Sequence, residues 1–404
     1  MDVGEEGLFL LLVAQGEPRA EDTTAIYSPP GWIIAMGRSI LFLVLAILAV
    51  LPSAASYAHE WNEGQPQKCN KLLTRKEWRT FTNREKAEWV GAVKVRSPSP
   101  GRYRCLASIR HERLSLTTDQ TVLEGKRSLY DDFSYSHASV EHSAHRNAYF
   151  LPWHRWFTYL FDTSLRRNCG YSGPTPYWDW SRDHADLFGS PVFEDSPEYG
   201  LGGTGDCDSS PEADCTAITG AFSPTGNFEL SWPIPHPLRR NLTLITGWFA
   251  HELPQNRTLG PDFVRNLTEQ TTGDFFRFQH AMALLHNHVH NFVGGDLAGD
   301  CPKILPEEDC QGMAISFTPN DPLFWLHHAQ LDRLWSEWQR HHPSNFAAFS
   351  GMPLTPHNMT DPRYDPNAHA DHRMPFDVQS VPVAPKSVFD TEGWPLCYRY
   401  TDEE

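Results

Sequence analysis

The sequence predicts a mainly α-helical fold with long, disulfide-linked loops and little β-structure. Apolar side chains recur every three or four positions over residues 128–139, 275–295 and 323–340, as they do along one face of a helix. Residues 181–260 are instead rich in Gly, Pro, Ser and Asp and contain few periodic segments, which is typical of surface loops. The sequence shows no internal repeat and no coiled-coil pattern.

The composition is that of a globular protein with a large core. The 404 residues are compatible with two or three domains or with one large domain. Fourteen tryptophans and 23 phenylalanines can supply that core. The net charge of −16 argues against nucleic acid as a partner, because phosphates require a basic surface. Eight cysteines, all from Cys69 onward, indicate an oxidised, secreted protein if a targeting signal precedes them.

A targeting segment precedes the cysteines. A basic residue, an apolar run over residues 40–51 and the small residues Ser56 and Ala58 together predict a signal peptide over residues 36–58. An uncleaved signal anchor is the alternative, and stable membrane association is expected only in that case. We interpret residues 1–35, which show no periodicity, as a gene-model extension or a cytosolic stub.

Sequons and cysteine pairs fit the secretory pathway. Asn-x-Ser/Thr triplets predict N-glycosylation at four positions: Asn241, Asn256, Asn266 and Asn358. Cys207 and Cys215 can pair, as can Cys301 and Cys310, but spacing alone does not fix the connectivity.

Two capping boxes predict short helices near Cys69. Each box places a threonine three residues before a glutamate, at Thr74 and Glu77 and again at Thr82 and Glu85. The polar, basic and irregular residues 96–128 are expected to form a loop or an insertion.

The next two helices each carry a histidine on an apolar face. Over residues 128–139, His137 shares a face with Tyr130 and Phe133. The second helix has Pro152 in its first turn, ends near Gly170, and places His154 in line with a stripe of aromatic and aliphatic residues.

Residues 275–295 predict a helix with two histidines one turn apart. Thr272 can cap its start and the Gly294–Gly295 pair ends it. His286 and His290 share a face with Phe275, Gln279 and Met282, so both imidazoles can reach one metal ion. His288 falls on roughly the opposite face, and we interpret it as a surface histidine.

The helix over residues 323–340 carries two adjacent histidines. Asp321 can cap it and Pro322 suits its first position. His328 shares a face with Phe324 and Trp335, whereas His327 lies about 100° around the helix. Periodicity alone does not choose between the two histidines. Asp332 and the adjacent Arg333 are expected to form a structural pair.

Four segments resemble a known family. They are FLPWHRWF at 150–157, PYWDW at 176–180, HNHVHNFVGGD at 286–296 and NDPLFWLHHAQLDRLWSEWQ at 320–339. In this order they resemble the tyrosinase and catechol oxidase (polyphenol oxidase) family of type-3 copper proteins, particularly its short fungal members, over residues 69–400. The resemblance implies an antiparallel four-helix bundle around a dicopper centre, in which three histidines from a pair of helices hold each copper.

The resemblance also implies a ligand set. Carried over by motif, the ligands of the first copper are His137, His145 and His154, and those of the second are His286, His290 and His328. His328 is preferred over His327 because the family's ligand stands four residues before the aspartate that matches Asp332. His142 competes with His137 for the first copper. Six imidazoles without a carboxylate or thiolate suit copper better than calcium or magnesium.

Two positions differ from the family's pattern, and one of them affects which phenols are expected to react. Ser143 stands where some fungal members have a cysteine bonded to a ligand histidine, so no such thioether is expected. Asn287 matches an asparagine that helps to hold a catalytic water, but the glutamate that assists it is missing, and Gln279 is the nearest polar substitute. Hydroxylation of monophenols needs a base for the phenol proton, so this departure favours diphenol oxidation.

We therefore expect a secreted oxidase with two copper ions, which uses O2 to convert o-diphenols or o-aminophenols to quinones in pigment or secondary-metabolite formation. The alternatives are a full tyrosinase that also hydroxylates monophenols and a non-enzymatic oxygen-binding protein. Residues 59–404 are expected to form a single copper domain. The motif at Tyr398–Tyr400 resembles the close of the family's core domain, so no C-terminal shielding domain is expected.

Overall fold

The computed structural model describes residues 68–94, 128–210, 212–244, 255–306, 317–353 and 367–401, all within one compact unit, Ala54–Glu404. The proposed stub, the signal segment and nearly all of the predicted loop at 96–128 lie outside these residues, as do Cys310 and Asn358. None of the helices in the described part of the chain is long and apolar enough to cross a membrane.

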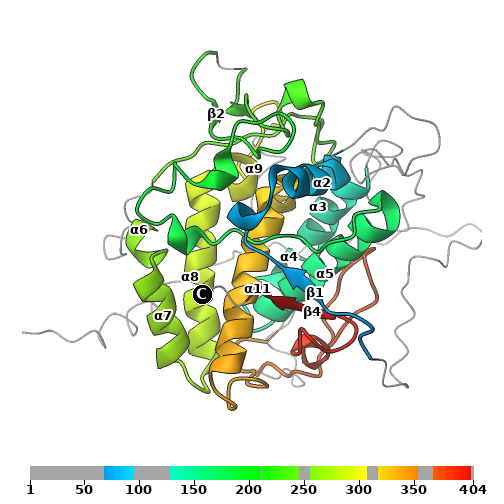
Figure 1. Cartoon of the computed structure of the whole chain (residues 1–404), viewed down its shortest axis with the longest axis vertical. Helices are drawn as coiled ribbons and strands as arrows, with labels where there is room; N and C mark the ends of the chain where they lie inside the picture. Colours follow the sequence, from blue (N-terminus) through cyan, green and yellow to red (C-terminus); the bar gives the residue numbers. More distant parts are fainter. Residues whose placement is uncertain are drawn as a thin grey trace, which may run out of the picture. The chain divides into compact units, whose positions relative to one another are not determined.

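The fold is mainly helical, as predicted (Figure 1). Its helices are α2 (Asn83–Lys94), α3 (Leu129–Ser139), α4 (Glu141–Ala144), α5 (Phe150–Cys169), α6 (Gln255–Thr258), α7 (Pro261–Gln270), α8 (Phe275–Val293), α9 (Gly295–Ala298) and α11 (Leu323–His341). Short 3-10 segments include η3 (Trp78–Thr80) and η8 (Thr318–Asn320).

The β-structure of the described residues is small. Strand β1 (Leu73–Arg75) pairs in parallel with β4 (Tyr398–Tyr400), and β2 (Gly205–Asp206) pairs antiparallel with β3 (Thr216–Ala217). A disulfide between Cys69 and Cys397 links the segments next to β1 and β4, although 328 positions separate the two cysteines in sequence. Cys207 and Cys215 are bonded to each other, and Cys301 is also disulfide-bonded.

Four helices, α3, α5, α8 and α11, surround the core. Helix α11 packs against α5 and α8, and Figure 1 shows α8 and α11 side by side. Aromatic rings join α3 and α5 to α11: the centroid of Trp325 lies 3.7 Å from that of Phe161 and 5.4 Å from that of Phe133. Large buried side chains thus hold together the helices that carry the candidate ligands.

Local sequence signals set most helix boundaries. Ser128 and Asp131 form a capping box at the start of α3, Thr82 and Glu85 form the predicted box before α2, and Gly170 ends α5 in the left-handed conformation. For α8 the predicted cap is wrong. Asp274 caps this helix rather than Thr272, since its carboxylate accepts a hydrogen bond from the backbone N–H of Arg277.

The predicted helix at Thr74 is also wrong. Thr74 lies in β1, and Glu77 caps the short η3 segment by accepting a hydrogen bond from the backbone N–H of Arg79. The pairing of β1 with the distant β4 overrides the local capping pattern, which does not encode that partner.

A buried network around Asp332 joins β1, α5, α11 and β4. The Asp332 carboxylate accepts hydrogen bonds from Arg75, Arg155 and the hydroxyl groups of Tyr398 and Tyr400. Burial alone would raise the pKa of Asp332, but the two guanidinium groups hold it below its usual value. The predicted pair of Asp332 with Arg333 is wrong, because Arg333 points to Asp179 and Glu337 instead.

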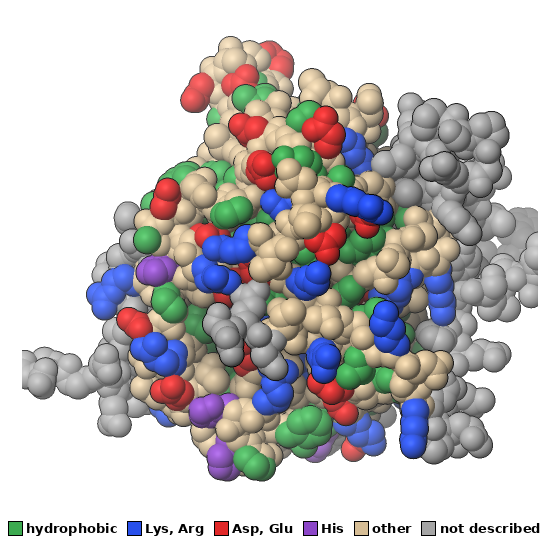
Figure 2. All heavy atoms as spheres, in the orientation of Figure 1, with side chains coloured by type: hydrophobic (Ala, Val, Ile, Leu, Met, Phe, Trp, Pro, Cys, Tyr) green, Lys and Arg blue, Asp and Glu red, His purple; other side chains and the backbone are tan. Residues whose placement is uncertain are grey.

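The described surface carries charges of both signs. On the face in Figure 2, acidic side chains gather toward the top of the view, and both signs occur over the rest, where Lys and Arg are the more frequent. The exposed sequon residues Asn241 and Asn266 lie outside the core, where a glycan can be accommodated.

Candidate metal centre

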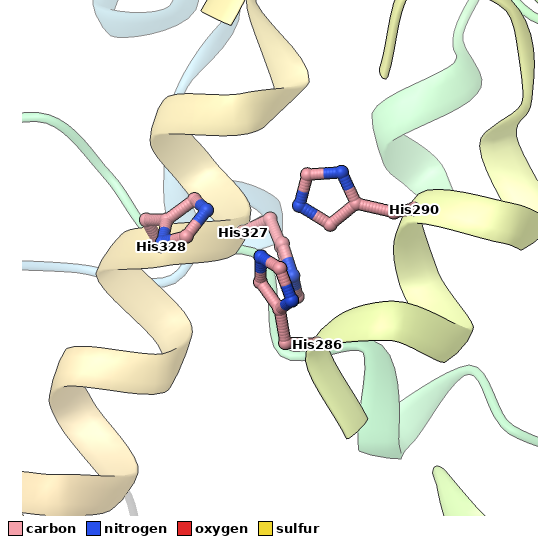
Figure 3. Close-up of side chains that lie close together, drawn as sticks. All are labelled: His286, His290, His327 and His328. Atoms are coloured by element: carbon pink, nitrogen blue, oxygen red, sulfur yellow. The ribbon is translucent and has the colours of Figure 1, made fainter. Parts of the chain in front are cut away.

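The structure gathers seven histidines into two groups. Within each group, one ring nitrogen per residue lies within 4.8 Å of those of its partners. The first group consists of His137 from α3, His145 from the loop after α4 and His154 from α5. The second consists of His286 and His290 from α8 and His327 and His328 from α11, as Figure 3 shows.

The rings of the first group converge. The ring centroids of His137 and His145 are 4.9 Å apart, and those of His145 and His154 are 5.0 Å apart. The Nε2 atoms of His137 and His154 face each other at 3.5 Å. Converging imidazole nitrogens of this kind suit a transition-metal ion.

The two groups adjoin each other. The rings of His154 and His328 stack with centroids 4.2 Å apart, and the rings of His145 and His286 are 6.0 Å apart. Phe324 lies one turn before His328, and its ring centroid is 4.1 Å from that of His328. Both groups therefore belong to one site at the centre of the helices.

Hydrogen bonds fix the tautomers of four rings. The Nδ1 atom of His154 lies 2.8 Å from the carbonyl oxygen of Phe150, and that of His145 lies 3.1 Å from the carbonyl oxygen of Glu141. His290 makes the same kind of bond to the carbonyl of Leu297, and His286 to the amide oxygen of Asn287. A carbonyl oxygen only accepts, so each Nδ1 carries the proton and each Nε2 keeps its lone pair.

The remaining ring nitrogens fit a metal. The Nε2 atoms of His286 and His290 and both ring nitrogens of His328 are buried without a hydrogen-bond partner. Buried polar atoms are normally paired, and a coordinated ion would satisfy these atoms. A donor set of neutral imidazoles suits copper and similar transition metals rather than calcium or magnesium.

The pKa values of these rings favour the neutral, metal-binding form. Burial, and then the neighbouring imidazoles, hold the pKa of His154, His286 and His328 well below the usual value. Burial lowers the pKa of His290 to about 4. Metal ligands must be deprotonated, so rings that stay neutral at mildly acidic pH are available to copper there.

These shifts predict a pH-dependent stability of the metal-free protein. A histidine whose pKa is lower in the folded than in the unfolded state binds protons preferentially when unfolded. The free energy of unfolding is therefore highest above the unfolded pKa of about 6.5 and decreases as the pH falls toward 4. We expect the melting temperature of chelator-treated protein to drop between about pH 7 and pH 5. Most carboxylates titrate below this interval. A melting temperature that stays constant across it would therefore contradict the conclusion that these histidine rings are buried in the neutral form.

The four histidines considered for the first copper do not lie together. His137, His145 and His154 come together, whereas the competitor His142 is exposed and belongs to neither group. His142 lies within the single turn α4, on the side away from the core.

Both adjacent histidines of α11 belong to the second group. His328 stacks on His154 of the first group, whereas His327 stacks on His286 with centroids 5.5 Å apart. The ring of His328 therefore contacts both groups, whereas the ring of His327 contacts histidines of the second group. Sequence reasoning did not predict that His327 would reach the group as well, although the adjacent pair on one helix was the signal for it.

The interpretation of His288 as a surface histidine is wrong. Its side chain is buried, and its Nδ1 lies 2.5 Å from the hydroxyl oxygen of Thr258 in α6. Helices α6 and α7 cover this face of α8, so a residue opposite the candidate ligands is still inside the protein. His288 nevertheless belongs to neither histidine group.

Asn287 lies at the edge of the site. Its side chain is exposed, and its amide oxygen lies 3.0 Å from Nδ1 of His286. Gln279, two turns earlier on the same helix, is buried. Asn287 thus orients a candidate ligand while remaining accessible to solvent.

Comparisons with known proteins agree with this geometry. A family model described as the common central domain of tyrosinase matches residues 127–341. A tyrosinase-like protein of Diaporthe leptostromiformis is 30% identical over 357 residues, covering 85% of this chain and 76% of the relative. The N-acetyl-6-hydroxytryptophan oxidase of Emericella nidulans is 28% identical over 409 residues, covering 88% of this chain and 99% of the relative.

A solved structure shares the fold. A variant of polyphenol oxidase from Thermothelomyces thermophila matches with a TM-score of 0.55 at 23% identity, covering 82% of this chain and 89% of that one. The predicted mainly helical architecture is confirmed by this match and by the described helices.

Proposed function

The chain belongs to the tyrosinase family of copper oxidoreductases, and we propose that it uses O2 to oxidise o-diphenols, or o-aminophenols, to quinones. One observation carries the proposal: two adjoining groups of histidines converge at the centre of the helices, and in the second group buried Nε2 atoms have no hydrogen-bond partner. Among the described residues, both groups consist of histidines alone, which favours a transition metal such as copper over a hard cation.

We propose that three histidines hold each copper ion. His137, His145 and His154 would hold the first ion, and His286, His290 and His328 the second. The bound pair of copper ions would supply O2 binding and the redox chemistry. The protein supplies rings with fixed orientation, a site shielded from bulk water, and an entrance for the substrate.

We infer where the substrate enters from the exposure of the site residues. The side chain of His145 is 13% exposed, whereas those of His137 and His328 are almost completely buried. His145 and His286 are neighbours, and the exposed Asn287 follows His286 directly. We propose that a small phenol approaches between His145 and Asn287, and that Asn287 holds a water there. The name of the Emericella relative, an oxidase of a hydroxylated tryptophan derivative, supports a phenolic substrate.

We propose that diphenols are oxidised much faster than monophenols. A monophenol must lose its proton to become a good ligand, and general base catalysis is typically worth about 10²–10⁴-fold. Helix α8 carries no carboxylate between its cap and His286, and a neutral amide such as Gln279 is a poor base. We expect initial rates on a catechol to exceed those on the matched monophenol by at least tenfold.

Three outcomes of that assay are decisive. Fast oxidation of the catechol alone supports the proposal. Comparable rates on both substrates would replace it with a full tyrosinase. Reversible O2 binding without turnover of either substrate would replace it with an oxygen-binding protein.

We also propose that the chain enters the secretory pathway. The disulfides in the described residues and the exposed sequon residues Asn241 and Asn266 support that route. Cleavage of the segment at 36–58 would leave a protein that begins near residue 59, which N-terminal sequencing of the secreted protein can test.

A further inference from the structure

One candidate ligand lacks the support that the others receive from a long helix. His137, His154, His286, His290 and His328 lie within α3, α5, α8 and α11. His145 instead follows the single turn α4 in an extended conformation, with φ −129° and ψ 161°. The next residue, Arg146, is exposed and has φ 58°, a left-handed conformation that is uncommon for residues other than glycine. A loop of this kind needs hydrogen bonds from elsewhere to stay in place.

Asn147 supplies those bonds. Its side chain is buried, and its amide nitrogen donates to the carbonyl of His145 at 2.8 Å. The same nitrogen lies 3.2 Å from the carbonyl oxygen of His142 and 3.3 Å from that of Ser143, which belong to the α4 turn. One side chain therefore bonds three carbonyl groups, two of the α4 turn and that of His145 itself.

The α4 turn in turn orients the His145 ring. The Glu141 carbonyl accepts hydrogen bonds from both the backbone N–H and the ring Nδ1 of His145. Any shift of α4 therefore moves the acceptor that sets the direction of the ring. Asn147 holds two further carbonyls of the same turn, so it fixes this acceptor relative to His145.

Asn147 also links the loop to the helix of another candidate ligand. Its side-chain oxygen accepts a hydrogen bond from the backbone N–H of Tyr149 at 2.8 Å, directly before α5 begins. Helix α5 carries His154, whose ring centroid is 5.0 Å from that of His145. The same amide thus ties the loop of one histidine to the start of the helix that carries the other.

We propose that Asn147 is a positioning residue that sets the affinity and geometry of the first copper site by holding His145 against α5. This inference rests on the proposed copper function and adds a residue outside the ligand set. Asn147 touches no reacting atom. Its effect passes through the backbone of His145 and the α4 turn.

The test is Asn147→Asp in the full chain. The carboxylate keeps the size of the amide and the acceptor for Tyr149, but it places an oxygen against three carbonyl oxygens. Loss of an outer partner of a metal ligand typically lowers metal affinity about 10–100-fold. We expect a loss of this size at the first site alone, measured as copper retained against a graded chelator. The half-loaded protein should give the EPR signal of an isolated cupric ion.

Asn345→Asp is the matched control. Asn345 is also buried, and both ends of its side-chain amide form hydrogen bonds. The amide nitrogen donates to the carbonyl of Trp338 at 2.7 Å, and the amide oxygen accepts from the backbone N–H of Gly273 at 2.6 Å. It lies in neither histidine group. We expect this variant to melt at a lower temperature while holding both coppers as tightly as the unsubstituted chain.

The outcomes separate the inference from the proposed function. Two coppers held with unchanged affinity in Asn147→Asp would overturn the inference alone, as would equal loss from both sites or the same selective loss in Asn345→Asp. A chain without copper before any substitution would overturn the inference and the function together. If Asn147→Asp does not fold, Asn147→Ser, which removes the amide without adding charge, should show the same selective loss.

Discussion

Replacing His154 or His328 with alanine is expected to remove copper from one of the two sites and to abolish oxidation of a catechol. Each ring points into a histidine group, and the two rings stack at 4.2 Å where the groups meet. Losing one of three nitrogen ligands opens the coordination of that ion, and the reaction needs both ions in place. The measurement is copper content by elemental analysis together with turnover of a catechol.

Two further histidines provide controls. His327→Ala removes a ring that contacts the second group only, and we expect it to retain both coppers. His288→Ala removes a buried ring outside both groups, so the melting temperature should fall while the copper content stays at two. Loss of copper in His327→Ala with retention in His328→Ala would reverse our choice between the adjacent histidines.

Asp332→Asn is expected to cause the largest loss of stability among single substitutions outside the ligands. Its carboxylate pairs with the fully buried Arg155 and accepts from two tyrosine hydroxyl groups. It is also a second acidic partner, at 3.4 Å, of the buried Arg75, which pairs with Asp162 at 2.7 Å. Removing one partner of a buried ion pair typically costs about 3–5 kcal/mol, because the remaining charge is left uncompensated. Denaturant unfolding of the metal-free protein should show a loss of this size.

A second ion pair on the same helix is the control. Glu337 pairs with Arg333, and their side chains are 37% and 13% exposed. Solvent screens a partly exposed pair more than a fully buried one, so Glu337→Gln should lower the unfolding free energy much less than Asp332→Asn does. Equal effects of the two substitutions would show that the buried network is not a main source of stability.

The parts of the fold and of the site that could be predicted are those whose sequence pattern lies within a single helix. The periodicity of α8 placed His286 and His290 on one face, and the structure brings the two together. In α11 the periodicity left His327 and His328 open, and only the resemblance favoured His328. His145 follows no helical period, so only the resemblance to the tyrosinase family pointed to it. The role that we propose for Asn147 could not be predicted from the sequence, because no sequence pattern marks a side chain that bonds to several backbone carbonyl groups.

The wrong predictions concern residues whose neighbours belong to other helices or strands. His288 lies opposite the candidate ligands on α8, but α6 and α7 cover that face, and a helical pattern does not reveal its neighbours. Thr74 and Glu77 match a capping box, yet β1 pairs with a strand more than 320 positions away. The partners of Asp332 are likewise distant in sequence, which is why the adjacent Arg333 was the wrong choice.

The most direct test of the account is the metal content of the unsubstituted protein, purified without added metal and then titrated with copper. The two histidine groups predict saturation at two copper ions per chain, together with turnover of a catechol that rises only as the second ion binds. Saturation at a single ion, or full activity with one ion bound, would contradict a dicopper centre built from these six histidines.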